Sequence, residues 1–154
     1  MTTTVTPFLW FDDNAEPALE RYLSLFDDAE LLDAQRHPDG ALFIASIRLQ
    51  GQPLMLMNGG PDFQLNEAFS LSVGVETQDE LDHLWDGLLE GGGHPTMCGW
   101  LVDAFGLSWQ IVPTALPRLL GDPDREAAGR AQAAMLQMQK LDVAALQAAF
   151  DGTA

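Results

Sequence analysis

The sequence predicts an α+β fold made of two βαβββ modules that form mixed sheets, followed by a C-terminal helical tail. Three observations predict it. A β-rich stretch leads into an amphipathic helix twice, first near the N-terminus and again from Phe69. Each helix is followed by runs of β-forming residues separated by turn residues. Beyond Pro113 the chain becomes rich in alanine, which is typical of helix. Two copies are too few for a stacked repeat array, so they indicate paired modules.

The first module opens with a strand and a helix. Val5–Phe11 alternates, with Thr6, Phe8 and Trp10 on one face and the remaining apolar residues on the other. Asp12-Asp13-Asn14 supplies turn and N-cap chemistry, and Pro17 fits only the first turn of a helix. The helix that follows has one continuous apolar stripe, formed by Ala15, Ala18, Leu19, Tyr22, Leu23 and Phe26.

The rest of the first module is β-rich. Glu30–Gln35 predicts a short strand, and Ala41–Leu49 and Pro53–Asn58 predict a hairpin closed by the turn at Gln50-Gly51-Gln52. Gly59-Gly60-Pro61-Asp62 then interrupts regular structure.

The second module repeats this order. Phe69–Val75 predicts a strand with Ser70, Ser72 and Gly74 on the face opposite its larger apolar residues. Thr77-Gln78-Asp79-Glu80 is a capping box, in which Thr77 bonds the amide of Glu80 and Glu80 reaches back. The apolar stripe of the next helix is Leu81, Leu84, Trp85, Leu88 and Leu89, and Gly91-Gly92-Gly93 ends it.

Cys98–Pro113 is the stretch around which we expect the chain to be organised. It predicts a short strand, a turn at Asp103–Gly106, and a second strand stopped by Pro113. Leu107, Trp109 and Ile111 alternate with polar Ser108 and Gln110, so one face is apolar and the other carries a hydroxyl and an amide. We expect that polar face to look into a pocket.

The tail predicts a turn at Arg118–Gly121, an alanine-rich helix capped by Asp122-Pro123 and running to about Gln139, and a short helix from Leu141. No linker separates these parts. The domain prediction is therefore one domain over 1–154, with module one at about 1–62, module two at about 63–114 and the tail at about 115–154.

Composition narrows the function classes. Seven Lys and Arg against 23 Asp and Glu give a formal net charge of −16, which disfavours nucleic acid and anionic membrane surfaces as partners. A single cysteine cannot form an internal disulfide. The N-terminus lacks the pattern of a signal peptide, and no apolar run reaches the length of a membrane span. We expect a cytoplasmic, acidic protein.

Three separated motifs carry a family resemblance. Pro7-Phe-Leu-Trp-Phe-Asp-Asp-Asn-Ala-Glu16, Met57-Asn-Gly-Gly-Pro61, and Cys98-Gly-Trp with Gly106-Leu-Ser-Trp-Gln-Ile-Val-Pro113 resemble the PhnB-like subgroup of the vicinal oxygen chelate superfamily. That superfamily includes glyoxalases, bleomycin-resistance proteins and extradiol dioxygenases, and the subgroup carries the name 3-demethylubiquinone-9 3-methyltransferase domain. The tail also resembles it. The resemblance implies a glyoxalase-like fold with cupped sheets around a small-molecule pocket, assembled as a homodimer.

Metal-using members of the superfamily place four ligands, usually His, Glu or Gln, on equivalent strand positions. Carried over, these positions fall on Thr6, Ser70, Gln110 and one residue within Met55–Met57, where the register stays open. Only Gln110 retains a plausible ligand, whereas divalent ions need several charged oxygens or three to four N, S or O donors. We expect no metal and no other cofactor.

Gln110 is the most informative polar residue, although it could simply satisfy a neighbouring backbone group. As a site residue it would bond a ligand carbonyl, with serine hydroxyls and aromatic walls around it. Cys98 lacks an evident base nearby and is expected to be a buried, inert thiol; His94, in a loop, is expected at the surface. They and Gln110 are the only catalytic candidates. The predicted ligand-binding set is Thr6, Phe8, Trp10, Met57, Ser70, Ser72, Trp100, Ser108 and Gln110.

The functional prediction is a metal-free small-molecule-binding protein whose groups from both halves converge on one hollow. The alternative is an enzyme of the lyase, isomerase or transferase type that uses Gln110 and pocket hydroxyls on a carbonyl-bearing or aromatic substrate. A dimeric scaffold with a filled pocket is the third possibility. The glycine clusters do not have the spacing of a nucleotide loop, and the Rossmann-like fold usual for methyl transfer is not predicted.

Overall fold

The computed structural model describes residues 2–153. The chain divides into two compact units, one ending at Asn66 and the other beginning at Glu67. Each unit contains one βαβββ module, as the sequence predicts. The second unit also contains the helical tail. The description as one domain stays a prediction.

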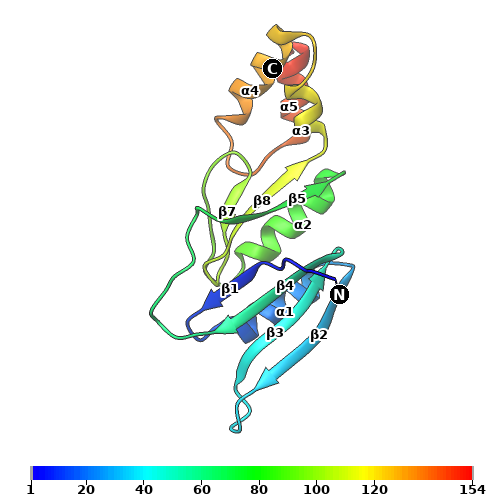
Figure 1. The fold of residues 1–154 in the computed structure, drawn as a ribbon. Coiled ribbons are helices and arrows are strands. Elements are labelled where there is room, and N and C mark those ends of the chain that lie inside the picture. Colours follow the sequence, from blue (N-terminus) through cyan, green and yellow to red (C-terminus); the bar gives the residue numbers. More distant parts are fainter. Residues whose placement is uncertain (1, 154) are drawn as a thin grey trace. The chain divides into compact units, whose positions relative to one another are not determined.

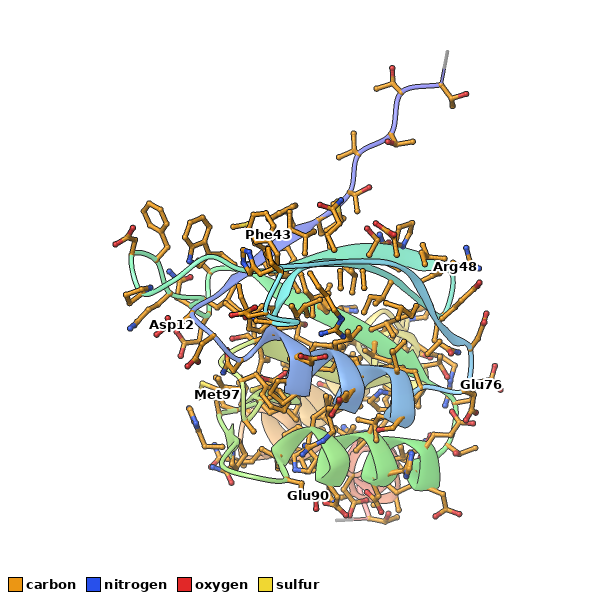
Figure 2. All side chains as sticks on the ribbon, turned by 90° about the horizontal axis from the view of Figure 1, so that it is seen from below. Asp12, Phe43, Arg48, Glu76, Glu90 and Met97 are labelled. Atoms are coloured by element: carbon orange, nitrogen blue, oxygen red, sulfur yellow. The ribbon has the colours of Figure 1, made fainter. Side chains whose placement is uncertain are left out.

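The first unit is a four-stranded sheet with a helix on one face (Figure 1). Its strands are β1 (Phe8–Phe11), β2 (Ala29–Arg36), β3 (Leu42–Leu49) and β4 (Gln52–Asn58), in the order β1-β4-β3-β2. Only β1 and β4 are parallel. Figure 2 shows α1 (Ala15–Leu25) along one side of this sheet and the labelled Phe43 on the other side.

The core of the first unit lies between the sheet and α1. Alternate strand residues turn toward the helix because side chains in a strand alternate between faces. The buried residues on this side are Leu9, Phe11, Ala45, Ile47, Leu54 and Leu56, and α1 contributes Ala15, Ala18, Leu19, Tyr22 and Leu25. The opposite, open face carries half-buried and exposed side chains.

The first strand is shorter than predicted. It begins at Phe8 rather than Val5. Pro7 has no N–H to donate to a ladder, although its carbonyl accepts a bond from Met55 N at 3.0 Å. Thr6 therefore precedes the sheet and is half-buried.

The second unit has the same architecture. Its strands are β5 (Ser70–Val75), β6 (His94–Pro95), β7 (Trp100–Val102) and β8 (Ser108–Pro113), in the order β5-β8-β7-β6. Helix α2 (Gln78–Leu89) packs on one face through Leu81, Leu84, Trp85 and Leu88. The strand residues that turn to this side include Leu101, Trp109 and Ile111, all buried. The open face carries the polar residues that alternate with these buried ones, among them Ser70, Ser108 and Gln110.

At the start of α2, one of the two predicted capping-box hydrogen bonds forms and the other has a different donor. The hydroxyl of Thr77 accepts from Glu80 N at 3.2 Å, as predicted. The return bond differs, because the Glu80 carboxylate accepts from the backbone of Glu76 rather than that of Thr77. Gly91 and Gly92 both have positive φ after the helix, which explains the glycine run there.

The tail contains three helices, one more than predicted: α3 (Ala115–Leu120), α4 (Arg125–Met135) and α5 (Val143–Asp151). The predicted turn at Arg118–Gly121 is mostly helix, because Leu116 and Leu119 bury against the other tail helices. The cap of α4 is Asp124 rather than Asp122, and its side chain accepts from Ala127 N. No helix within residues 2–153 combines the length and the apolar composition needed to cross a bilayer.

One glutamine ties the tail to α2. Gln78 Nε2 donates to Leu141 O at 3.1 Å and to Asp82 Oδ1 at 2.9 Å, while its Oε1 accepts from Val143 N at 2.8 Å. Lys140 also reaches Asp82, at 3.0 Å. The bond from Gln78 and then the bond from Lys140 lower the pKa of the Asp82 carboxyl below its ordinary value. The first residue of α5, Val143, therefore donates its amide to a side chain of α2.

Replacing Gln78 with alanine is expected to speed hydrogen exchange at the Val143 amide by about fivefold, since one hydrogen bond contributes about 1 kcal/mol and the amide loses its acceptor. Gln78→Glu keeps that acceptor and loses both donors, so it should protect Val143 better than alanine does. Gln132→Ala, at an exposed position of α4, is the control. Unchanged exchange at Val143 in Gln78→Ala would show that the tail does not depend on this side chain.

Candidate functional site

The open face of the second sheet brings together five of the predicted ligand-binding residues. Ser70 pairs with Ser108, and Ser72 pairs with Gln110, in the parallel β5–β8 ladder. Trp100 pairs with Gln110 on the other side. Directly paired residues point to the same face of a sheet. The two serines of β5, Trp100, and Ser108 and Gln110 of β8 therefore form one surface, here called the polar face.

Gln110 is oriented by Ser70. Its Nε2 donates to Ser70 Oγ at 3.0 Å, and both side chains are half-buried. An amide has one acceptor oxygen and two donor hydrogens, and a hydroxyl donates one hydrogen. This bond therefore leaves Gln110 Oε1 as an acceptor and the Ser70 hydroxyl as a donor. The amide does not satisfy a neighbouring backbone group, which was the other interpretation of Gln110.

Ser108 is an exception to the rule that buried polar groups are bonded. The residue is 1% exposed, and its hydroxyl has no hydrogen-bond partner among the described residues. An unsatisfied buried hydroxyl costs about 1–3 kcal/mol. Each such group in a folded protein calls for a physical reason.

A buried carboxylate fixes the hairpin that carries the polar face. Asp103, 3% exposed, accepts at Oδ1 from the amides of Phe105 and Leu107 at 2.8 and 3.0 Å. Its Oδ2 accepts from Trp109 Nε1 at 2.8 Å. These charge-assisted bonds hold the turn and the Trp109 ring on the α2 side, which fixes the direction of Ser108 and Gln110.

The remaining predicted site residues lie on the first unit. Phe8 and Trp10 of β1 pair in register with Met55 and Met57 of β4, and these four share the open face of that sheet. The register left open by the sequence is thereby resolved. Phe8 is 47% exposed, and the other three are half-buried. We call these four residues the apolar face. Thr6 lies two residues before Phe8, outside β1.

The Asn-Gly-Gly motif supports Trp10. Gly59 lies against the indole, where a Cβ would come within 2.4 Å of the ring. Trp10 Nε1 donates to Gly60 O at 2.9 Å, and the Phe63 ring meets the indole edge-on at 5.1 Å between centroids. Asn58 binds elsewhere: its Oδ1 accepts from Ala15 N at 2.8 Å, at the start of α1. This motif therefore has a structural role: it holds the Trp10 ring of β1 and the first turn of α1.

The two modules also define which first-unit position corresponds to Gln110. Met55 follows the hairpin glycine Gly51 at the same spacing as Gln110 follows Gly106. Phe8 pairs with Met55 as Ser72 pairs with Gln110. By this spacing Met55, rather than Met57, is the counterpart of Gln110.

The donor set at the superfamily ligand positions does not fit a metal ion. It comprises the hydroxyls of Thr6 and Ser70, the thioether of Met55 and the amide of Gln110, without a single charged oxygen or imidazole. Within residues 2–153 no three His, Cys, Asp or Glu side chains group so as to hold an ion.

The other catalytic candidates are His94 and Cys98. His94, on β6, is exposed and pairs with Val102, which in turn pairs with Ser108, so His94 lies in the same row of the sheet as Ser108. Cys98 is half-buried rather than buried, and its φ of +55° is unusual for a residue with a side chain. Its amide donates to Met138 O at 2.8 Å, so the tail holds it in this conformation.

Sequence reasoning missed the roles of Asp103, Asn58 and Phe63, and it left Met55 as one of three candidates for a single position. Asp103 was assigned to a turn, and only the polar indole nitrogen of Trp109 six residues later could have indicated a buried acceptor. Phe63 was placed in a loop with no pattern to mark it. Both partnerships depend on tertiary structure.

Comparison with known proteins places this geometry in a family. Residues 3–112 match the model of a family described as 3-demethylubiquinone-9 3-methyltransferase. A PhnB protein from Bacillus cereus, described under the same name, is 31% identical over 73% of this chain and 100% of its own, with a TM-score of 0.68.

Two more distant structures share the fold. Protein PA1353 from Pseudomonas aeruginosa is 21% identical over 73% of this chain and 98% of its own, with a TM-score of 0.59. A glyoxalase-related enzyme from Fulvimarina pelagi is 16% identical over 75% of this chain and 91% of its own, with a TM-score of 0.52. No curated protein matches the chain. The family match ends at residue 112, so the resemblance predicted for the tail lies outside it.

Proposed function

Because the chain belongs to the 3-demethylubiquinone-9 3-methyltransferase family, with its glyoxalase-like fold, we propose that it binds a small, partly apolar organic molecule without a metal ion. The observation that carries the proposal is the Gln110–Ser70 hydrogen bond on the polar face. It orients an amide whose carbonyl oxygen is left to accept a further bond, on a face that also carries an unpartnered hydroxyl at Ser108.

The composition of the strands that form the polar face supports a site for a neutral ligand. The sequences of β5, β7 and β8 contain hydroxyls, one amide and apolar groups, and none of their residues is charged. Small-molecule sites are mostly apolar with a few placed polar groups, which matches this composition. Trp100 provides the apolar plane beside Gln110.

The apolar face of the first unit is proposed as a second contributor. Phe8, Trp10 and Met57 were predicted to contact the same ligand as the polar face, together with Thr6, and that assignment stays a prediction. Met55 joins them because it shares their face. Assembly as a homodimer and a cytoplasmic location are likewise proposals that the family membership supports.

Methyl transfer is not part of the proposal, although the family name contains it. The described sheets are mixed, with one parallel pair each. Neither glycine cluster follows a strand and opens a helix, as a nucleotide-type phosphate loop does.

An enzymatic function is the second candidate, and the backbone at Cys98 favours it. Strained φ values cluster at functional sites, and Cys98 combines φ +55° with partial exposure two residues before Trp100. In this alternative Gln110 and the serines would bind a carbonyl-bearing substrate, and Cys98 or His94 would supply the reactive group. Turnover of carbonyl substrates that is lost both in Gln110→Ala and in Cys98→Ser would support it over simple binding.

The test of ligand binding uses a panel of neutral aromatic fragments and the ¹⁵N-labelled chain. We expect amide shifts at Ser70, Ser72, Ser108 and Gln110, and we expect Gln110→Ala to weaken binding about tenfold, the equivalent of about 1.4 kcal/mol. Gln52→Ala, at an exposed position of β4, is the matched control. Shifts confined to other residues, or equal affinity in Gln110→Ala and the wild type, would contradict the proposal.

A further inference from the structure

We propose that the polar face is specific for a neutral carboxamide-type group, in which a carbonyl and an N–H lie side by side, as in an aromatic carboxamide or lactam. This inference rests on the proposed function and names its ligand class. It follows from which donors and acceptors the face leaves unused.

The donor side consists of two neighbouring hydroxyls. Ser70 and Ser108 are direct partners in the β5–β8 ladder, so their Cα atoms are about 4.8 Å apart. The Ser70 oxygen already accepts from Gln110, which leaves its hydrogen to donate. Ser108 has no partner at all in the described chain. A carbonyl oxygen has two lone pairs and can accept from both hydroxyls.

The acceptor side is the oxygen of Gln110. Its orientation is fixed by the bond from Nε2 to Ser70 Oγ, so Oε1 is presented next to the two hydroxyls. An acceptor in this position favours a ligand that donates an N–H or O–H. A site that hydrogen-bonds such a group discriminates strongly against an analogue without it, because its own polar atom is then left unpaired.

Charge disfavours a carboxylate, another common carbonyl group with two polar atoms. A carboxylate would place a negative charge beside the Gln110 oxygen, and no residue of β5, β7 or β8 is cationic. The one titratable side chain on the edge strand β6, His94, lies in the same ladder row as Ser108 and Ser70, through Val102. It is three strands from Ser70, about 14 Å between Cα atoms, so it is too distant to pair with a carboxylate held there. The net charge of −16 adds a further repulsion. A neutral ligand avoids both costs.

A role in binding ligand would explain why the chain keeps the unpartnered Ser108 hydroxyl, although burying it costs stability. Without ligand the hydroxyl is buried and unsatisfied, so the side chains that cover it must move aside before a carbonyl oxygen bound at Ser70 can accept from it. Removing it should therefore stabilise the free protein and weaken the complex. A hydroxyl with a purely structural role would give the opposite sign in the first measurement.

The experiment compares benzamide with benzoate, benzaldehyde and N,N-dimethylbenzamide, using ¹⁵N chemical shifts and the thermal midpoint of the full chain. Benzamide should bind at least tenfold more tightly than the other three, with shifts at Ser70, Ser108 and Gln110. Ser108→Ala should weaken benzamide binding about tenfold and raise the unfolding midpoint by about 2–4 °C. Ser24→Ala, at an exposed position of α1, is the control and should change neither.

The outcomes separate this inference from the proposed function. If benzoate, benzaldehyde or the dimethylated amide shifts the polar face with affinity equal to that of benzamide, the amide specificity is wrong and the binding function stands. If none of the four probes shifts that face, both are overturned. A lower unfolding midpoint in Ser108→Ala overturns the role given to its hydroxyl.

Discussion

Replacing Asp103 with alanine is expected to lower the free energy of unfolding by about 3–5 kcal/mol. The carboxylate accepts from two backbone amides and from the indole N–H of Trp109, and the bonds to Leu107 and Trp109 are buried. Alanine would remove the acceptor of all three bonds at once. Urea denaturation followed by tryptophan fluorescence measures the loss.

Asp103→Asn is the informative companion variant. The asparagine amide keeps one acceptor oxygen but turns an NH₂ group toward a donor. This variant should therefore be less stable than the wild type and more stable than Asp103→Ala. Asp86→Ala, at an exposed position of α2, is the control and should change stability by less than about 0.5 kcal/mol. A loss below about 1 kcal/mol in Asp103→Ala would mean that the turn holds without its carboxylate.

Replacing Gly99 with alanine is expected to cost about 2–4 kcal/mol, because two effects add. Gly99 has a φ of +88°, which strains any residue with a side chain by about 1–3 kcal/mol. A Cβ there would also lie 2.8 Å from Leu141 Cδ1 and 3.1 Å from Ile111 O. The new methyl group would push the tail away from the hairpin, and urea denaturation again gives the loss.

Gly106→Ala separates the two effects. Gly106 has a similar φ of +98°, but nothing lies within 4 Å of the position its Cβ would occupy. It should therefore show the backbone cost alone, and hydrogen exchange in α5 should stay slow. Equal losses in the two variants would show that contact with Leu141 contributes nothing at Gly99.

The sequence was most informative where a pattern is local. Alternation in β8 correctly separated Ser108 and Gln110 from Trp109 and Ile111, because burial of one sheet face imposes a period of two. Most residues of the predicted α1 and α2 stripes are buried for the same kind of reason, although Leu25 rather than Leu23 is buried in α1 and Leu89 is only half-buried in α2. The order of elements and the glycine-rich turns then determined the two βαβββ modules.

Partners distant in sequence could not be predicted. The bond from Gln110 to Ser70 joins residues in strands that become neighbours only when the sheet forms. The register at Met55 depends on a parallel pairing with β1 that no local pattern encodes. The extra tail helix α3 was missed because Arg118–Gly121 was predicted to be a turn, whereas packing of Leu116 and Leu119 favours helix there. Whether the predicted site residues act together remains a prediction.

The link between Asn58 and the start of α1 has a consequence for synthesis on the ribosome. The amide of Ala15 finds its acceptor 43 residues later in the chain, and the indole of Trp10 finds its own 50 residues later. Contacts between distant residues form late, because the intervening chain must close first. The N-terminal helix should therefore fray in a nascent chain that stops short of Asn58. It should become protected only once the Asn-Gly-Gly segment has left the exit tunnel.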